Sequence, residues 1–259
     1  MLKVNHQKNV LTLTLNRPEV RNALSEALVE ALIKTLTEYK NHKDVRAVIL
    51  QGAGQSFCSG GDIAWLKEIG QSTFQKNKES AQLLESLFHL INHYPKPVLG
   101  IVHGVAMGGG FGLISVCDYV LAEHHTQLSL SELKIGIVPS VIMPYVISKI
   151  GESWVRALML TGRKLSALEA LKIGLIHDTF QTLQEKEEKK NEIMRGFLSS
   201  GPQAIIQAKK LLHDLKFLPH DKIREHVIHI LAEVRASGEG QEGLSAFLQK
   251  RYPRWIEEL

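Results

Sequence analysis

The sequence predicts a mixed α/β protein whose C-terminal part is helical. Up to about residue 122, short apolar or alternating segments of the kind found in strands take turns with longer segments of helical spacing. Beyond about Trp154 the strand-like segments end and only helical spacing remains. The chain has 259 residues, 44% of them hydrophobic, which suffices for one large domain with a helical appendage.

The first half of the chain supplies the predicted sheet. Residues 10–15, VLTLTL, alternate strictly and predict a half-buried strand, which the following residues 16–18, NRP, bring to an end. Leucines recur every fourth residue from Leu24 onward, with Ser25 near the start, so residues 24–39 predict an amphipathic helix. The same criteria predict buried strands at 47–50, 98–102 and 119–122 and helices at 76–92 and 111–116.

The second half supplies helices, which we expect to pack on the α/β core. We place the boundary so that residues 1–195 form the core domain, which carries the site, and residues 196–259 form a helical subdomain. Helices are predicted at 152–160, 166–173, 184–198, 202–215, 222–236 and 239–249.

The composition limits the partners and the compartment. A formal net charge of +4 and a pI of about 8.9 arise from scattered residues, so nucleic acid and membrane are not favoured, while an anionic small molecule would fit. The two cysteines, Cys58 and Cys117, have neither disulfide nor metal-ligand spacing, and we expect no bound metal. The polar N-terminus is no signal peptide and no apolar run could span a bilayer, so the expected location is the cytoplasm.

Two glycine-rich turns, each between a predicted strand and a predicted helix, form the first candidate site. Residues 57–63, FCSGGDI, combine small residues that let a ligand approach the backbone with Asp62, which can cap the next helix. Residues 104–112, GVAMGGGFG, carry three consecutive glycines but no phosphate-loop lysine and no dinucleotide fingerprint. A plain tight turn and a close helix crossing are the structural alternatives. Together, however, the turns can aim two backbone N–H groups at one point, which is how an oxyanion hole is built.

Glu132 is the candidate acid or base. It lies in the mostly apolar segment 128–139, LSLSELKIGIVP, whose only other charge is Lys134. If the carboxyl is partly buried, its pKa rises toward the range that is useful for proton transfer. A surface glutamate paired with Lys134 is the open alternative.

The order of these segments resembles the enoyl-CoA hydratase superfamily, also called the crotonase superfamily. The resemblance covers essentially the whole chain, and so many motifs in one order make it specific at the superfamily level. It is carried by residues 16–18 (NRP), 21–24 (RNAL), 57–63 (FCSGGDI), 103–104 (HG), 108–110 (GGG), 117–118 (CD), Glu132, 136–139 (GIVP), 161–162 (TG), 167–174 and 247–251 (FLQKR).

This resemblance implies a ββα spiral core and an acyl-CoA thioester as the substrate, so coenzyme A is part of the substrate and no separate cofactor is expected. By position, the N–H groups of Gly61 and Gly109 are the expected oxyanion donors, and Glu132 is the expected acid/base. It also implies a homotrimer or a hexamer, with the C-terminal helices as the trimerisation surface. The residues expected to bind the substrate are Arg21, Ala23, Leu24, Ser59, Gly61, Asp62, Ile63, Gly108, Gly109 and, on this or a neighbouring subunit, Lys250.

The chain departs from the best-known hydratases of the superfamily at one position. Those enzymes use a second glutamate three residues after the second oxyanion donor, and here that residue is Gly112, which cannot transfer a proton. Three hypotheses follow: hydration of a 2-enoyl-CoA with Glu132 alone, double-bond isomerisation by the same glutamate, and a non-catalytic protein that binds RNA or CoA. The RNA hypothesis finds no RNA-binding motif in the sequence.

Hydration is the hypothesis that the sequence favours. Residues 131–146 resemble the branch that contains methylglutaconyl-CoA and carboxygeranoyl-CoA hydratases, and so does the GGGFG of residues 108–112. The substrates of that branch are branched and carry a distal carboxylate, as in leucine degradation. We therefore expect hydration of a 2-enoyl-CoA, with 3-methylglutaconyl-CoA as a candidate.

Overall fold

Two sheets organise the chain, and the polypeptide passes from one to the other several times. In the computed structural model, which describes residues 1–257, the larger sheet has the strand order β1-β2-β3-β4-β6-β9 and the smaller the order β5-β7-β8. The strands are β1 (Leu2–Gln7), β2 (Val10–Leu15), β3 (Ala47–Gly52), β4 (Val98–Val102), β5 (Val105–Met107), β6 (Tyr119–Glu123), β7 (Gln127–Ser129), β8 (Leu165–Ser166) and β9 (Asp178–Phe180).

The larger sheet is parallel apart from its first pair. β1 and β2 form an antiparallel hairpin, and β2, β3, β4, β6 and β9 then run parallel. Successive side chains of a strand point to opposite faces. Val48 and Leu50 accordingly belong to the main hydrophobic core, whereas Ala47 and Ile49 belong to a second core on the other face. A continuous apolar run is typical of such a strand, because both of its faces are buried.

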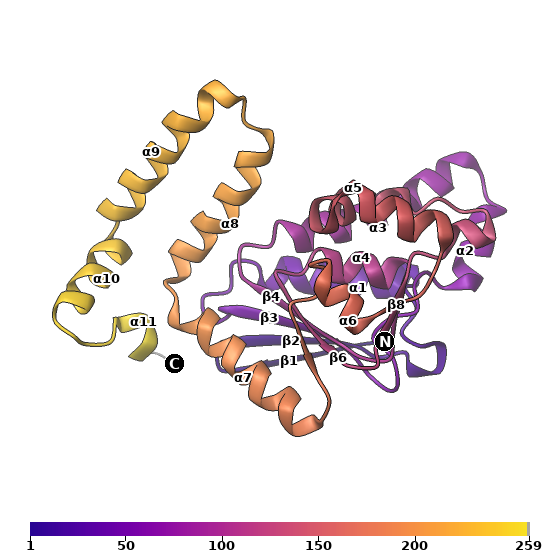
Figure 1. The fold of residues 1–259 in the computed structure, drawn as a ribbon, viewed down its shortest axis with the longest axis horizontal. Helices are drawn as coiled ribbons and strands as arrows, with labels where there is room; N and C mark the ends of the chain where they lie inside the picture. The colour runs from indigo at the N-terminus through magenta and orange to yellow at the C-terminus, as the bar shows by residue number, and fades with distance from the viewer. Residues whose placement is uncertain (258–259) are drawn as a thin grey trace.

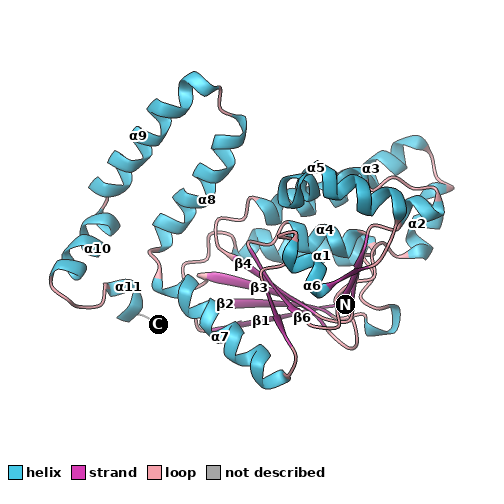
Figure 2. Ribbon diagram, viewed as in Figure 1, coloured by secondary structure: helices cyan, strands magenta, loops and turns pink. Residues whose placement is uncertain are grey.

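Helices cover both faces of the larger sheet. The helices are α1 (Glu26–Tyr39), α2 (Ile63–Gly70), α3 (Phe74–Asn92), α4 (Gly109–Ser115), α5 (Met143–Thr161), α6 (Ala167–Lys172), α7 (Leu183–Ser199), α8 (Pro202–Phe217), α9 (His220–Ala236), α10 (Gly238–Leu248) and α11 (Arg254–Glu257), with 3-10 turns η1 (Pro18–Val20), η2 (Glu132–Ile135) and η3 (Ser140–Ile142). α1, α3, α4 and α5 lie together on one face of the larger sheet (Figure 2). α7 covers the other face, where Met194 packs into the second core.

Successive turns of the chain add one strand to each sheet and then a helix. β4 joins the larger sheet, β5 the smaller, and α4 follows; β6 and β7 repeat this order before η2 and α5. A bridge between Cys58 and Ala106 brings the segment after β3 into the smaller sheet in the same way. The segments that leave the smaller sheet for a helix therefore lie next to one another, and these segments are the two glycine turns.

Beyond α7 the chain leaves the core. α8, α9 and α10 form an arm that projects past the sheets (Figure 1). In residues 1–257 no helix has both the length and the apolar character needed to cross a membrane. The arm nevertheless exposes apolar side chains to between 50% and 81%: Leu212, Phe217, Ile228, Leu231, Leu244, Phe247 and Leu248.

The predicted α/β core with a helical C-terminal part is confirmed, with one correction. The expectation that strands end before Trp154 is wrong, because β8 and β9 follow it and β9 extends the larger sheet. These strands have only two and three residues, too few for any periodicity to mark them. The helix expected from residue 152 is the second half of α5, which begins at Met143 and is interrupted at Gly151, where φ is 78°.

Candidate active site

The two glycine turns lie directly against each other. Leu24 holds the first turn: its N–H donates to the Gly60 carbonyl at 2.7 Å, and its own carbonyl accepts the Asp62 N–H at 2.9 Å. A Cβ on Gly60 would lie 3.1 Å from the carbonyl oxygen of Met107 and 3.7 Å from the backbone nitrogen of Gly109. Gly60 also has a φ of 104°. The close approach of the two turns therefore requires glycine at this position.

The backbone N–H groups of Gly61 and Gly109 have no acceptor in the part of the chain that the structure describes. Among the described residues, neither group donates a hydrogen bond within the chain. Gly109 begins α4, so its N–H has no acceptor inside the helix, whereas the neighbouring Gly108 N–H donates to the Ser129 carbonyl at 3.0 Å. Two free donors on touching turns, one of them at a helix start, can hold an oxygen that becomes negative.

A buried asparagine, to which the sequence alone assigns no role, braces the first turn. Asn22 is fully buried with a φ of 57°. Its Nδ2 donates to the carbonyls of Ala53 and Ser56 at 2.8 and 2.7 Å, and its Oδ1 accepts the Arg17 N–H at 2.8 Å. The Arg17 guanidinium also pairs with Asp62 at 2.8 Å and is the main reason that the pKa of Asp62 is lowered. An asparagine just ahead of a predicted helix start was the available signal, since asparagine tolerates the left-handed conformation.

Asp62 has the structural role that its position in the first turn suggested. It is the N-cap of α2, and its Oδ1 accepts the N–H groups of Ala64 and Trp65 at 3.0 and 3.4 Å. Its Oδ2 is bound to Arg17. A carboxylate held ionised by three donors is poorly suited to take up a proton at neutral pH.

The carboxyl of Glu132 lies beside the second turn. A Cβ on Gly108 would lie 2.8 Å from Oε1 of Glu132, so a side chain there would collide with the carboxyl. Oε2 is buried and has no hydrogen-bond partner in residues 1–257. Burial raises the pKa of Glu132, against the opposing effect of the N–H groups of Glu132 and Ser131. The alternative of a surface ion pair with Lys134 is not observed within that part of the chain.

Apolar side chains fill the space beside Gly112. A Cβ on Gly112 would lie 2.4 Å from Cγ2 of Ile142 and 3.0 Å from Cε1 of Phe88. Ile142 is 4% exposed and Phe88 is 1% exposed. At Gly112, the position to which the sequence resemblance assigns the second carboxylate of the two-glutamate enzymes, this chain has a wall of packed apolar side chains. Among the described residues of the candidate site, Glu132 is therefore the carboxylate with an unused oxygen, since Asp62 is held by Arg17 and the start of α2.

The residues predicted to bind the rest of the substrate fall into two groups. Arg21, Ala23 and Ser59 lie with Leu24 and Asp62 at the first turn, where the Ser59 N–H donates to the Arg21 carbonyl at 3.0 Å. Ile63 is 68% exposed at the start of α2. Lys250, in contrast, follows α10 in the arm, and Figure 1 shows α10 at the opposite end of the molecule from α2. One chain therefore does not bring Lys250 to its own glycine turns.

Neither cysteine has the environment of a reactive thiolate. Cys58 and Cys117 are buried, and burial raises the pKa of both thiols to about 12, so neither is a thiolate at neutral pH. No group of three or more histidine, cysteine, aspartate or glutamate side chains in residues 1–257 is arranged to hold a metal ion.

The chain is similar to known proteins over almost its whole length. Residues 5–258 match the family model described as enoyl-CoA hydratase/isomerase. A Thermus thermophilus protein assigned as an enoyl-CoA hydratase is 32% identical over 247 residues, which cover 95% of this chain and 97% of that protein. The peroxisomal Delta(3,5)-Delta(2,4)-dienoyl-CoA isomerase of Arabidopsis thaliana is 28% identical over 267 residues, covering 99% and 96%. The structure of Pseudomonas aeruginosa AtuE superimposes with a TM-score of 0.95 at 32% identity and covers 98% of this chain and 99% of its own. The chain thus has the crotonase fold and belongs to the enoyl-CoA hydratase/isomerase family.

Proposed function

We propose that this protein adds water to the double bond of a 2-enoyl-CoA thioester, with Glu132 as its only acid/base. The observation that carries the proposal is the position of the Glu132 carboxyl. Its Oε1 lies against Gly108, one residue before the free N–H of Gly109, and its buried Oε2 has no partner in the described chain. A water molecule or a substrate C–H can occupy that unused acceptor.

The proposed reaction moves one proton through one carboxyl. Ionised Glu132 takes a proton from water as the oxygen of that water bonds to the β-carbon of the substrate. The electrons of the double bond move onto the thioester oxygen, where the Gly61 and Gly109 N–H groups stabilise the enolate. Protonated Glu132 then returns the proton to the α-carbon, which yields the 3-hydroxyacyl-CoA. Each such N–H donor typically contributes about 3–4 kcal/mol of transition-state stabilisation.

Double-bond isomerisation is the second candidate, and the wall beside Gly112 is the observation that favours it. Shifting a double bond from C3 to C2 needs one carboxylate to remove a proton from one carbon and deliver it to another. No water has to be positioned in that reaction, and the apolar surface of Ile142 and Phe88 offers none of the polar partners that an ordered water needs.

The acyl group that we propose is branched with a distal carboxylate, of the 3-methylglutaconyl type. The support for it is the sequence of residues 131–146, which resembles hydratases of such substrates. For the coenzyme part, the exposed Ile63 and the braced segment around Arg21 support binding along the first turn. A screen of short, branched and carboxylated enoyl-CoA thioesters ranks these substrates directly.

The first prediction separates hydration, isomerisation and binding without turnover. Glu132→Gln keeps the size of the side chain but removes the proton acceptor, so hydration of crotonyl-CoA and 3-methylglutaconyl-CoA should fall about 10²- to 10⁴-fold. Glu152→Gln, a charge change at an exposed carboxylate of α5, should leave the rate unchanged. Full activity of the Glu132→Gln enzyme would refute the role of Glu132. If the protein converts a 3-enoyl-CoA but adds no water to a 2-enoyl-CoA, its reaction is isomerisation and not hydration.

The second prediction concerns pH. Burial disfavours the ionised form of Glu132 and raises its pKa above the ordinary value of 4.5, so the base becomes protonated, and inactive, at a higher pH than a solvated glutamate would. A profile of kcat/KM against pH should therefore lose activity on the acid side with a midpoint above 4.5. Activity that stays constant down to pH 4.5 in a protein that remains folded would contradict this environment for Glu132.

The third prediction tests the wall. Gly112→Glu should lower the melting temperature, because its Cβ would lie 2.4 Å from Ile142. Combining it with Ile142→Ala should recover part of that loss and raise the hydration rate, since a second carboxylate then has room. Gly196→Glu is the matched control, because nothing lies within 4 Å of a Cβ at that helical position. A Gly112→Glu protein as stable as the wild type would show that no wall is present.

The fourth prediction concerns assembly. We propose that residues 196–259 form the trimerisation subdomain, because the arm leaves Leu212, Phe217, Phe247 and Leu248 between 66% and 81% exposed. A neighbour's arm would also bring its own Lys250 toward the glycine turns, which one chain does not. Light scattering should give a mass three or six times the 29.0 kDa of one chain. A mass of 29.0 kDa at micromolar concentration would contradict the proposal.

A further inference from the structure

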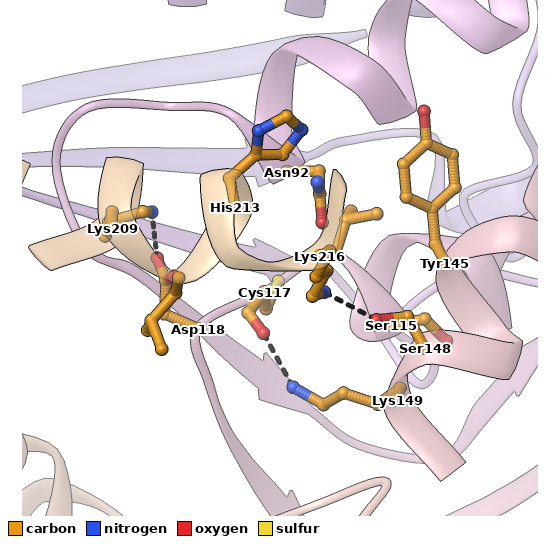
Figure 3. Close-up of a pocket in the computed structure, with 12 residues that line it drawn as sticks. Asn92, Ser115, Cys117, Asp118, Tyr145, Ser148, Lys149, Lys209, His213 and Lys216 are labelled. Atoms are coloured by element: carbon orange, nitrogen blue, oxygen red, sulfur yellow. Dashed lines mark hydrogen bonds and ion pairs between the residues drawn. The ribbon is translucent and has the colours of Figure 1, made fainter. Parts of the chain in front are cut away.

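A cavity of about 260 Å³ lies between the core and the arm, away from the glycine turns. Four parts of the chain meet around it: the end of α3 at Asn92, residues 115–118 at and after the end of α4, the first two turns of α5, and α8 (Figure 3). Gly109, the first residue of α4, precedes Ser115 by six helical positions, which corresponds to about 9 Å along the axis. On α3, the cavity-lining Asn92 lies one turn beyond the packed Phe88. On α5, the cavity-lining Tyr145 lies three residues beyond the packed Ile142. The cavity is thus a different place from the candidate active site.

The charges around this cavity do not balance. Three lysines line it, Lys149 from α5 and Lys209 and Lys216 from α8, against one carboxylate, Asp118. Asp118 is already engaged: its Oδ2 accepts the Val98 N–H at 2.7 Å and forms an ion pair with Lys209. Asp118 also acts on Lys149 through its charge, but one carboxylate cannot offset three lysines, so the lining of the cavity keeps a net positive charge.

Within the described residues, the ammonium groups of Lys149 and Lys216 are hydrogen-bonded to neutral oxygens. Lys149 Nζ donates to the Cys117 carbonyl at 2.9 Å, and Lys216 Nζ donates to the Ser148 hydroxyl at 2.6 Å (Figure 3). In residues 1–257 neither lysine makes an ion pair. Burial lowers the pKa of Lys149, the charge of Asp118 opposes this shift, and the charge of Lys216 adds to it. A partly enclosed pocket lined by charges of one sign concentrates the opposite charge inside it.

A purely structural role explains only part of this arrangement. Lys149 satisfies a carbonyl just after α4, which is a common task for lysine at a helix end. That role requires neither Lys216, which reaches the same cavity from the arm, nor the open space between the two elements. Two like charges facing one cavity repel each other, and an anion between them would turn this repulsion into attraction.

We infer that the cavity binds a small, doubly charged anion of the phosphate class, held by Lys149 of the core and Lys216 of the arm. A cavity of about 260 Å³ is large enough for such an ion together with ordered water. Each ammonium keeps N–H groups beyond the one already used, so both can donate to the anion without losing their present bonds. The bound ion joins α5 to α8 and thereby fixes the arm on the core.

Calorimetric titration of the full-length protein with inorganic phosphate, at pH 7 and with ionic strength held constant by potassium chloride, tests this inference. We expect saturable binding of one phosphate per chain. Lys149→Gln and Lys216→Gln should each weaken it by about tenfold or more, because each removes a hydrogen bond to a charged group. Lys216→Arg should retain binding. Lys210→Gln, the same charge change on the same helix but outside the cavity, should change the affinity less than twofold.

Each contrary result has a definite meaning. Absence of saturable binding up to millimolar phosphate overturns the inference, and so does equal weakening by Lys210→Gln and Lys216→Gln, which would indicate nonspecific attraction. Because Lys216 is exposed, its replacement does not endanger folding, and its result stands even if the Lys149 variant is unstable. Coenzyme A is the second probe: if saturating CoA displaces the phosphate, the cavity belongs to the substrate site and is not separate. Phosphate binding does not depend on the proposed reaction, so failure of either proposal leaves the other unaffected.

Discussion

The geometry of the candidate site follows from the close contact between two backbone turns. The turn after β3 and the turn before α4 touch at Gly60, where even a Cβ would lie 3.1 Å from the Met107 carbonyl. That contact brings the backbones of the two turns together, and in the described chain the N–H groups of Gly61 and Gly109 have no acceptor. The spiral of strands and helices produces this contact. Each time the chain passes from the larger sheet through the smaller one, the turn that follows lies beside the previous turn.

Around these two proposed donors, burial determines the state of the neighbouring carboxyl groups. Asp62 lies next to Gly61 in sequence, yet Arg17 and a helix start keep it ionised. Glu132 comes from a distant segment and is left with a buried oxygen that has no partner in the described chain and with a raised pKa. Close packing also explains the glycine at position 112, because Ile142 and Phe88 leave no room there for a side chain. The packing around Gly112, and not only the glycine itself, therefore excludes a second carboxylate at this position.

The sequence predicts the helices and strands that have a clear periodic or apolar pattern. It also predicts the site residues that lie close together along the chain. The helix near Leu24 and the strand at 47–50 carry strong periodicity or a long apolar run, and both are confirmed. β8 and β9 escape prediction because their pairing, rather than their two or three residues, makes them strands. The brace at Asn22 escapes it because its partners, Ala53 and Ser56, lie more than thirty positions away. For the same reason no spacing could show that Lys149 and Lys216 face one cavity or that Ile142 closes the space at Gly112.

If Gly61 and Gly109 together hold the thioester oxygen, a crystal structure with a saturated acyl-CoA, which cannot react, will show it. We expect the thioester oxygen within about 2.7–3.1 Å of both backbone nitrogens. We also expect the α-carbon on the side of Glu132. A thioester oxygen that contacts neither nitrogen, in a complex where the acyl chain is otherwise ordered, would rule out this pair of donors.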